Sequence, residues 1–349
     1  MYKHGGDVYQ NNVKYDFSAN LNPLGIPERV IRAACDGVVE SRCYPDPDCA
    51  KLRKAISDSI GMMYDYIICG NGAADLIYSL ALAIKPKKAL IPIPSFYEYE
   101  QALKAVDCEI IYVDMKEEEK FCLNKDILSK ITKEIDILFL CNPNNPTGYL
   151  LQKSLLKKVL DRCKQCEVML VVDECFMDFV SNSLDYSLME EINQSKYLFL
   201  LKAFTKLYSM AGLRLGYGVS SDTKLLQRMK QVMQPWSVSI PAQLAGIAAL
   251  SEREYVKKSL EIIREEKEYL MKELQMIKCR VYHSEANYIF FRAMKGLYER
   301  CLSKGVLIRD CSNYPGLREG FYRIAVRTHK ENEYLIQVMK EEIGCQNQS

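Results

Sequence analysis

The sequence predicts an α/β protein with a mostly parallel sheet in a large domain, followed by a smaller α+β domain. Between about residues 64 and 220, short apolar runs alternate with longer amphipathic stretches. Runs this short and apolar are typical of strands buried on both faces of a sheet, and helices between them imply right-handed parallel crossovers. Residues 251–280 are rich in charge and carry apolar residues at helical spacing, which predicts one long helix that leads into the smaller domain.

Six strands are expected in the large domain, at residues 66–69, 89–93, 109–113, 137–141, 168–172 and 197–201. The change from weak periodicity to strand–helix alternation and then to a charged helix predicts three parts of the chain. These are an N-terminal arm with part of the small domain (1–40), a large domain (41–248) and a C-terminal small domain (249–349). The acidic run Glu117–Glu119 is expected to be a solvated loop.

The composition excludes several classes of function. The 349 residues include 47 Lys and Arg against 45 Asp and Glu, a balance that argues against nucleic acid or a membrane surface as a partner. No apolar run approaches the roughly 18 residues that span a bilayer, and the first residues show no signal peptide, so we expect a cytoplasmic protein. The single CxxC, Cys163 to Cys166, has no second ligand pair beside it, and we expect no metal site.

Polar residues follow the predicted strands, where ligands bind in open parallel sheets. Gly70 to Gly72 follow one strand, Asp173 follows another, and Lys206 follows the last. A lysine amine can bond to the aldehyde of pyridoxal phosphate, and an aspartate can pair with its pyridine nitrogen. A glycine turn that enters a helix offers free backbone N–H groups to its phosphate. The sequence therefore predicts a pyridoxal phosphate site.

Three motifs carry a family resemblance: Asn142–Gly148 (Asn-Pro-Asn-Asn-Pro-Thr-Gly), Asp173–Phe176 (Asp-Glu-Cys-Phe), and Thr205-Lys206 followed by Gly212-Leu213-Arg214. With these motifs in this order, the chain resembles the fold-type I, aspartate aminotransferase-like enzymes of aminotransferase class I and II over essentially its whole length. Within that family it is most similar to the threonine-phosphate decarboxylases of cobalamin biosynthesis, and the histidinol-phosphate aminotransferases are near relatives.

The resemblance implies a role for each matching residue of the cofactor site. Lys206 would hold pyridoxal 5'-phosphate, rather than Lys202, because Lys206 has the family's spacing to Arg214. Asp173 would be the partner of the pyridine nitrogen, and Asn145 would bind the ring hydroxyl. The other implied contacts are Phe96 on the ring face and, around the phosphate, Gly72, Ala73, Ala74, Thr205 and Arg214. Tyr44 would reach the phosphate in the neighbouring subunit, so a homodimer is expected.

The resemblance also implies a site for a phosphorylated amino acid. Arg323 would bind the substrate carboxylate through a forked guanidinium. Arg309 would bind the substrate phosphate, and the other expected substrate contacts are His4, Asn20 and Arg327.

One departure from the family pattern bears on the reaction. Aminotransferases of this family usually carry a tyrosine three residues after the pyridine-binding aspartate, and here that residue is Phe176. The resemblance thus implies decarboxylation of L-threonine O-3-phosphate to (R)-1-amino-2-propanol O-2-phosphate, with serine phosphate as a close variant. The alternatives are a histidinol-phosphate aminotransferase and a non-catalytic ligand-binding relative, although such a relative is not expected to keep both Lys206 and Asp173.

Overall fold

Seven strands form the main sheet in the computed structural model, which describes residues 5–344. Their order across the sheet is β2-β8-β7-β6-β5-β3-β4. Their bounds are β2 (Ile67–Gly70), β3 (Lys88–Ile93), β4 (Glu109–Asp114), β5 (Ile137–Cys141), β6 (Met169–Asp173), β7 (Leu198–Ala203) and β8 (Gly216–Val219). Five adjacent strands all run parallel to one another: β7, β6, β5, β3 and β4. The six predicted strands are confirmed, with ends that differ by no more than two residues.

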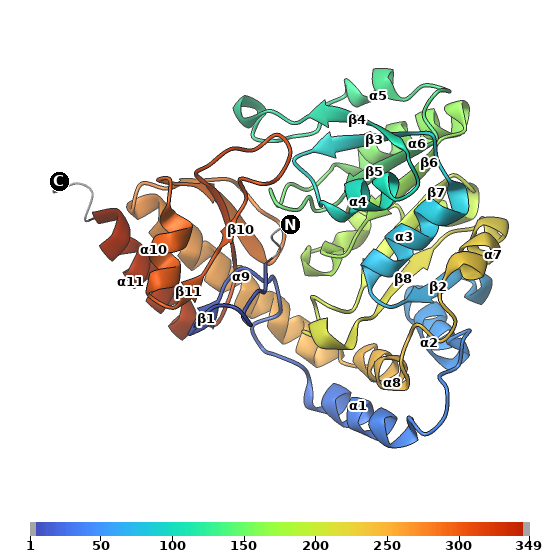
Figure 1. The fold of residues 1–349 in the computed structure, drawn as a ribbon, viewed down its shortest axis with the longest axis horizontal. Helices are drawn as coiled ribbons and strands as arrows, with labels where there is room; N and C mark the ends of the chain where they lie inside the picture. The colour runs from blue at the N-terminus through green and yellow to red at the C-terminus, as the bar shows by residue number, and fades with distance from the viewer. Residues whose placement is uncertain (1–4, 345–349) are drawn as a thin grey trace.

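Helices cover both faces of this sheet (Figure 1). Alternate residues of one strand enter different cores: Phe139 packs on the face shared with α3, α4 and α7, whereas Leu138 and Leu140 pack on the other face. The helices of this domain are α2 (Ala50–Ile60), α3 (Ala73–Ile84), α4 (Glu98–Lys104), α5 (Ile127–Lys130), α6 (Lys153–Cys166), α7 (Thr223–Val232) and α8 (Ile240–Ala249). Burial on both faces explains why the strands are almost entirely apolar.

β8 is a strand that the sequence analysis missed, and it is antiparallel to both of its neighbours, β2 and β7. Its sequence, Gly-Tyr-Gly-Val, resembles a turn more than a strand. The packing explains both glycines. A Cβ at Gly218 would lie 2.2 Å from the Phe199 ring, and a Cβ at Gly216 would lie 2.7 Å from the Ala73 backbone nitrogen. β8 therefore lies closer to β7 and to the start of α3 than a strand with side chains could.

The C-terminal residues form a second sheet with the strand order β12-β13-β10-β9, in which every neighbouring pair is antiparallel. These strands are β9 (Arg280–Val281), β10 (Tyr288–Arg292), β12 (Arg309–Asp310) and β13 (Phe321–Ala325), and the helices beside them are α9 (Arg253–Met276), α10 (Leu297–Ser303) and α11 (His329–Gly344). The long predicted helix is confirmed as α9, which runs from the large domain into the small one (Figure 1).

The N-terminal segment contacts both parts of the protein. β1 (Tyr15–Asp16) pairs in parallel with β11 (Val306–Leu307) of the small domain. α1 (Glu28–Glu40) instead packs on α8, so tightly that a Cβ at Gly37 would lie 2.6 Å from Pro241. The domain limits at residues 40 and 248 stay predictions. No helix among residues 5–344 is long and apolar enough to cross a bilayer.

The β7–β8 contact predicts a loss of stability on replacement of Gly218. Gly218→Ala places a methyl group inside the contact radius of Phe199, and overpacking of this kind costs about 1–3 kcal/mol. Urea unfolding followed by circular dichroism measures the change. Gly212→Ala is the matched control because a Cβ there meets no atom within 4 Å. Equal midpoints for the two variants would contradict this account of β8.

Candidate active site

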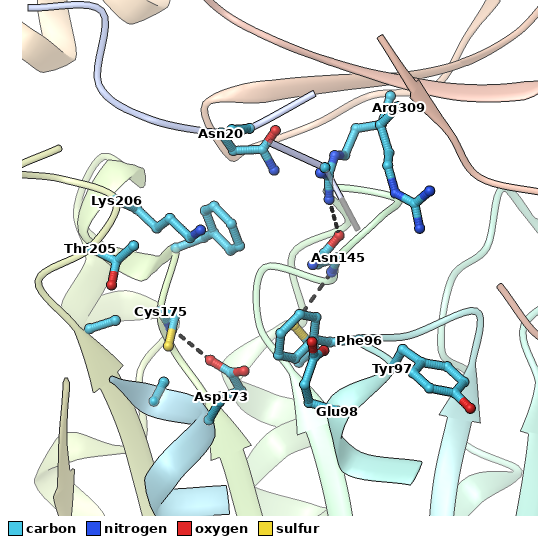
Figure 2. A pocket seen from close by; sticks show the side chains of 18 of the residues that line it. Asn20, Phe96, Tyr97, Glu98, Asn145, Asp173, Cys175, Thr205, Lys206 and Arg309 are labelled. Atoms are coloured by element: carbon cyan, nitrogen blue, oxygen red, sulfur yellow. Dashed lines mark hydrogen bonds between the residues drawn. The ribbon is translucent and has the colours of Figure 1, made fainter. Parts of the chain in front are cut away.

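A cavity of about 330 Å³ lies where the strand ends of the large sheet face the small domain. Small-molecule sites in proteins are commonly about 300–1,000 Å³. Figure 2 shows Lys206, Thr205 and Asp173 on one side of this cavity, Asn145 and Phe96 on another, and Asn20 and Arg309 across from them. The structure thus brings together residues from β6, from the loops after β3, β5 and β7, and from the small domain.

Lys206 lies in the loop after β7, is partly exposed and lines this cavity. Burial lowers the pKa of its amine to about 8, and the positive charges of Arg323 and Arg214 act in the same direction. Its Nζ forms no hydrogen bond or ion pair with any side chain in residues 5–344, and it lies 5.8 Å from the centre of the Phe176 ring. An amine with these properties is partly neutral near pH 8 and can attack an aldehyde.

Lys202, four residues earlier, has a different environment. Its Nζ donates to Asp178 at 2.6 Å and lies 4.0 Å from a carboxylate oxygen of Glu174. Burial opposes the charge, but the charges of Asp178 and Glu174 outweigh it and raise the pKa of the Lys202 amine. Lys202 therefore stays protonated and structural, which agrees with the choice of Lys206 from the motif spacing.

Asp173 ends β6, and its buried carboxylate is fixed by two hydrogen bonds. Oδ2 accepts from the Tyr99 hydroxyl at 2.5 Å, and Oδ1 accepts from the Cys175 backbone N–H at 3.0 Å. Burial next to this carboxylate raises the pKa of Tyr99, so the phenol keeps its proton and donates. These two donors hold the carboxylate at the cavity, where a protonated ring nitrogen could pair with it.

The start of α3 has the features of an anion-binding site. Gly72 precedes the helix with a φ of 85°, no side chain caps the first turn, and Ala73 and Ala74 line the cavity. A Cβ at Gly72 would lie 2.6 Å from a guanidinium nitrogen of Arg214, so only glycine leaves room for this arginine. Free backbone N–H groups beside the Arg214 charge suit a phosphate group, and Thr205 lines the same cavity.

Asn145 and Arg323 form a second polar group on the small-domain side. The Asn145 Oδ1 accepts from Arg323 Nη1 and, at 3.3 Å, from the Tyr314 hydroxyl. Because its oxygen is already bonded twice, the side-chain amide offers its NH₂ to a ligand. Arg323 Nη2 donates to the Ser18 carbonyl at 2.9 Å, whereas its buried Nε has no partner in residues 5–344. A guanidinium with a free buried N–H suits a carboxylate ligand.

Arg309 lies beside Arg323, because the two residues are directly opposite each other on β12 and β13. Both are buried and both line the cavity. Arg309 donates to the Asn313 side chain at 2.8 Å and to the Asp310 carbonyl at 2.6 Å. Asn20 also lines the cavity, and its buried Oδ1 has no partner among the described residues.

Three predicted site residues are not part of this assembly. Tyr44 is 79% exposed outside the cavity, where its ring packs on Trp236 at 4.7 Å. Arg327 does not line the cavity, and its guanidinium pairs with Glu331 at 2.7 Å. The placement of Arg327 therefore gives no support to its predicted substrate contact. His4 lies outside the described residues 5–344.

Tyr99, Tyr314 and Ser18 were not predicted to act in the site. Tyr99 follows Phe96 closely in the chain, which could have indicated it, and the two rings lie 5.5 Å apart. No local pattern marks Tyr314 or Ser18, because each acts on a residue more than 160 positions away.

The assembled residues fit pyridoxal phosphate on structural grounds. The cavity has an amine of lowered pKa, a fixed carboxylate, an anion site at a helix start and an aromatic ring, Phe96. These groups match the aldehyde, the ring nitrogen, the phosphate and the ring face of the cofactor in turn.

Comparison with known proteins identifies the family of the chain. The family model for aminotransferase class I and II matches residues 12–339. The chain is 37% identical over 329 residues to a threonine-phosphate decarboxylase from Salmonella typhimurium. The aligned region covers 93% of this chain and 90% of that protein. It is 32% identical over 330 residues to a histidinol-phosphate aminotransferase from Methanosarcina mazei, with coverages of 92% and 86%. The crystal structure of the histidinol-phosphate aminotransferase from Clostridium acetobutylicum matches with a TM-score of 0.87 at 30% identity, over 94% of this chain and 98% of that one.

The lowered pKa of Lys206 predicts how the cofactor-free protein takes up pyridoxal phosphate. Only the neutral amine reacts, so the initial rate of attachment should rise about fivefold from pH 7 to pH 8 and level off above about pH 9. Absorbance of the bound cofactor measures this rate, and borohydride reduction with mass spectrometry locates the bond. Lys206→Ala is the control and should give no reducible bond at any pH. A rate that keeps rising toward pH 10.5 would contradict the lowered pKa.

Proposed function

The chain belongs to the aminotransferase class I and II family, whose cofactor is pyridoxal 5'-phosphate, and from this premise we propose that it decarboxylates L-threonine O-3-phosphate. The product is (R)-1-amino-2-propanol O-2-phosphate, a precursor for cobalamin. Serine phosphate, which lacks one methyl group, is the close variant that the pocket discriminates least, because one methyl group is worth only about 1–3 kcal/mol.

The observation that carries the proposal is the pair of arginines on β12 and β13. Like charges directly opposite each other across a strand pair are unfavourable. Arg309 and Arg323 are nevertheless buried together at the cavity that contains Lys206. A substrate with both a carboxylate and a phosphate neutralises both guanidinium groups, so this pair favours a phosphorylated amino acid over one with a single anionic group.

The residues of this chain have separate tasks in the reaction. When bound, pyridoxal phosphate supplies an aldehyde for amines and a ring that takes up the electron pair left by bond cleavage at Cα. The Lys206 amine holds the aldehyde between turnovers and delivers a proton from Nζ to Cα after carbon dioxide leaves. Asp173, fixed by Tyr99 and Cys175, would hold the ring nitrogen of the cofactor.

Phe176 supports decarboxylation in particular, whereas Arg323 can serve either candidate reaction. Both terminal nitrogens of Arg323 are held, one by Asn145 and the other by Ser18. The guanidinium therefore fixes the direction of the substrate carboxylate. Phe176 offers no hydroxyl to the site, and its ring packs edge-on against Tyr288 at 5.0 Å.

The second candidate is a histidinol-phosphate aminotransferase. The TM-score of 0.87 to a solved enzyme of that name, at 30% identity, favours it. Arg309 would then bind the phosphate of histidinol phosphate, and Arg323 would bind the carboxylate of 2-oxoglutarate. A non-catalytic relative is disfavoured, because both Lys206 and Asp173 are present in the cavity.

A single-turnover experiment separates these candidates. The cofactor-loaded protein is mixed with L-threonine O-3-phosphate, and carbon dioxide and cofactor absorbance are followed together. The expected result is carbon dioxide release with return of the starting absorbance. Arg309→Gln should lower kcat/KM for the phosphorylated substrate by roughly 30- to 1,000-fold, which corresponds to a lost charged contact of about 2–4 kcal/mol. Conversion of the cofactor to its amine form by histidinol phosphate, without carbon dioxide, would establish the aminotransferase instead.

We also propose a homodimer in which Tyr44 acts in the partner's site. Tyr44 and its neighbour Trp236 are both exposed aromatic residues, which is unusual for a surface without a partner. Light scattering of the cofactor-loaded protein should give twice the 40.1 kDa of one chain. A monomeric, fully active enzyme would rule out this role for Tyr44.

A further inference from the structure

Glu117 lies in the segment that follows β4 at the edge of the large sheet, and the expectation of a solvated loop was wrong for this residue. Its side chain is only 13% exposed. Its carboxylate accepts hydrogen bonds from four small-domain residues. The donors are Arg280 at 3.0 Å, Tyr282 at 2.7 Å, Arg292 at 3.1 Å and Arg318 at 3.2 Å. Burial opposes ionisation, but these donors and charges outweigh it and lower the pKa of Glu117.

Phe121, four residues later, is inserted into the same part of the small domain. Its buried ring meets Tyr282, Phe290 and Phe321 edge-on, at centroid distances of 5.3, 5.5 and 5.8 Å. Lys120 and Phe121 have φ values of 55° and 57°, a conformation that residues with side chains rarely adopt. The chain therefore bends sharply here, and the bend directs the ring into the small domain.

This contact continues directly into the active site. Phe321 and Arg323 are two residues apart on β13, so both side chains leave the same face of the strand. Phe290 is the register partner of Arg323 on β10. The small-domain face that packs on Phe121 is thus the face that presents Arg323 to the cavity.

The loop between β12 and β13, residues 311–320, is fixed at two points. On the outside, Arg318 donates to Glu117. On the inside, Tyr314 donates to Asn145, and Asn313 accepts from Arg309. One loop therefore connects Glu117 of the large domain to both Asn145 and Arg309.

We propose that Glu117 is a positioning residue, and that Glu117 with Phe121 forms a clasp that holds the 311–320 loop and β13 at a fixed distance from Lys206. This distance sets the fit of a substrate that carries two anionic groups, so the kinetic part of the inference rests on the proposed function. Glu117 itself does not line the cavity.

The charge balance explains why one carboxylate has this effect. Three guanidinium groups converge on Glu117, and each belongs to a different segment of the small domain. An isolated surface ion pair contributes little, whereas a network around a nearly buried carboxylate contributes more. Without the negative charge, the arginines repel one another, and Arg318 moves the loop away from the large domain.

Steady-state kinetics of Glu117→Gln in the cofactor-loaded enzyme test the inference. This substitution keeps the side-chain volume and removes the charge. We expect KM for L-threonine O-3-phosphate to rise roughly tenfold while kcat changes less than about threefold, because the substrate contacts move and the Lys206 chemistry does not. The matched control is Glu118→Gln, since Glu118 is exposed and adjacent. Equal KM values for the two variants would overturn the role of Glu117.

Hydrogen exchange gives a readout that needs no substrate. Peptides from residues 311–321 should exchange about tenfold faster in Glu117→Gln than in the parent enzyme, because the Cys311–Phe321 and Tyr314–Cys311 backbone bonds open more often. Peptides from β6 should be unchanged. Unchanged exchange in residues 311–321 would refute the clasp whatever the substrate, whereas faster exchange without turnover of threonine phosphate would count only against the proposed function.

A further variant guards against poor folding. Arg318→Gln removes an arginine that is 66% exposed, so the variant should fold. On its own, Arg318→Gln should loosen the 311–320 loop, because the hydrogen bond from Arg318 to Glu117 is lost. In the Glu117→Gln background it should partly restore KM, because it removes one of the repelling charges. Additive effects of the two substitutions would overturn the proposed coupling.

Discussion

The parallel direction of β3, β5, β6 and β7 is the constraint on which the rest of the structure depends. Strands that run in parallel end at the same edge, so the segments that follow them meet there. Asp173 ends β6 opposite Cys141 of β5 and Leu201 of β7. Phe96, Asn145 and Lys206 lie just beyond the ends of their strands and reach the same cavity. Residues separated by more than 100 positions thus form one site without any local contact between them.

The environment of each charged group then decides its chemistry. Lys202 and Lys206 are four residues apart, yet one lies against two carboxylates and the other faces a cavity bordered by arginines. The first amine is held in its charged form, and the second is moved toward neutrality. Asp173 likewise has two fixed donors, so its carboxylate cannot turn away from the cavity. The large domain therefore supplies a reactive amine and an oriented carboxylate.

The small domain supplies the complementary charges through an antiparallel sheet. Arg309 and Arg323 are register partners on β12 and β13, which places two guanidinium groups side by side. Their position relative to Lys206 depends on contacts between the domains. Asn145 and Ser18 hold Arg323 from within, and the clasp of Glu117 and Phe121 holds its strand from outside. The width of the cavity is therefore a property of the domain interface rather than of either domain alone.

The sequence by itself determined the fold class and six of the seven large-sheet strands, because period and composition are local properties of the chain. Its motifs also pointed to Lys206, Asp173 and Asn145, which the structure brings to one cavity. It did not reveal β8, whose glycines are needed only because Phe199 and the start of α3 lie against them. It also did not reveal the bond from Tyr99 to Asp173 or the four donors around Glu117, each of which joins elements far apart in the chain. It named Arg327, whereas the tertiary structure pairs that side chain with Glu331 outside the cavity. Only the packing of distant segments decides which polar groups meet, since the energy of a hydrogen bond or an ion pair depends on distance in space and not on distance along the chain.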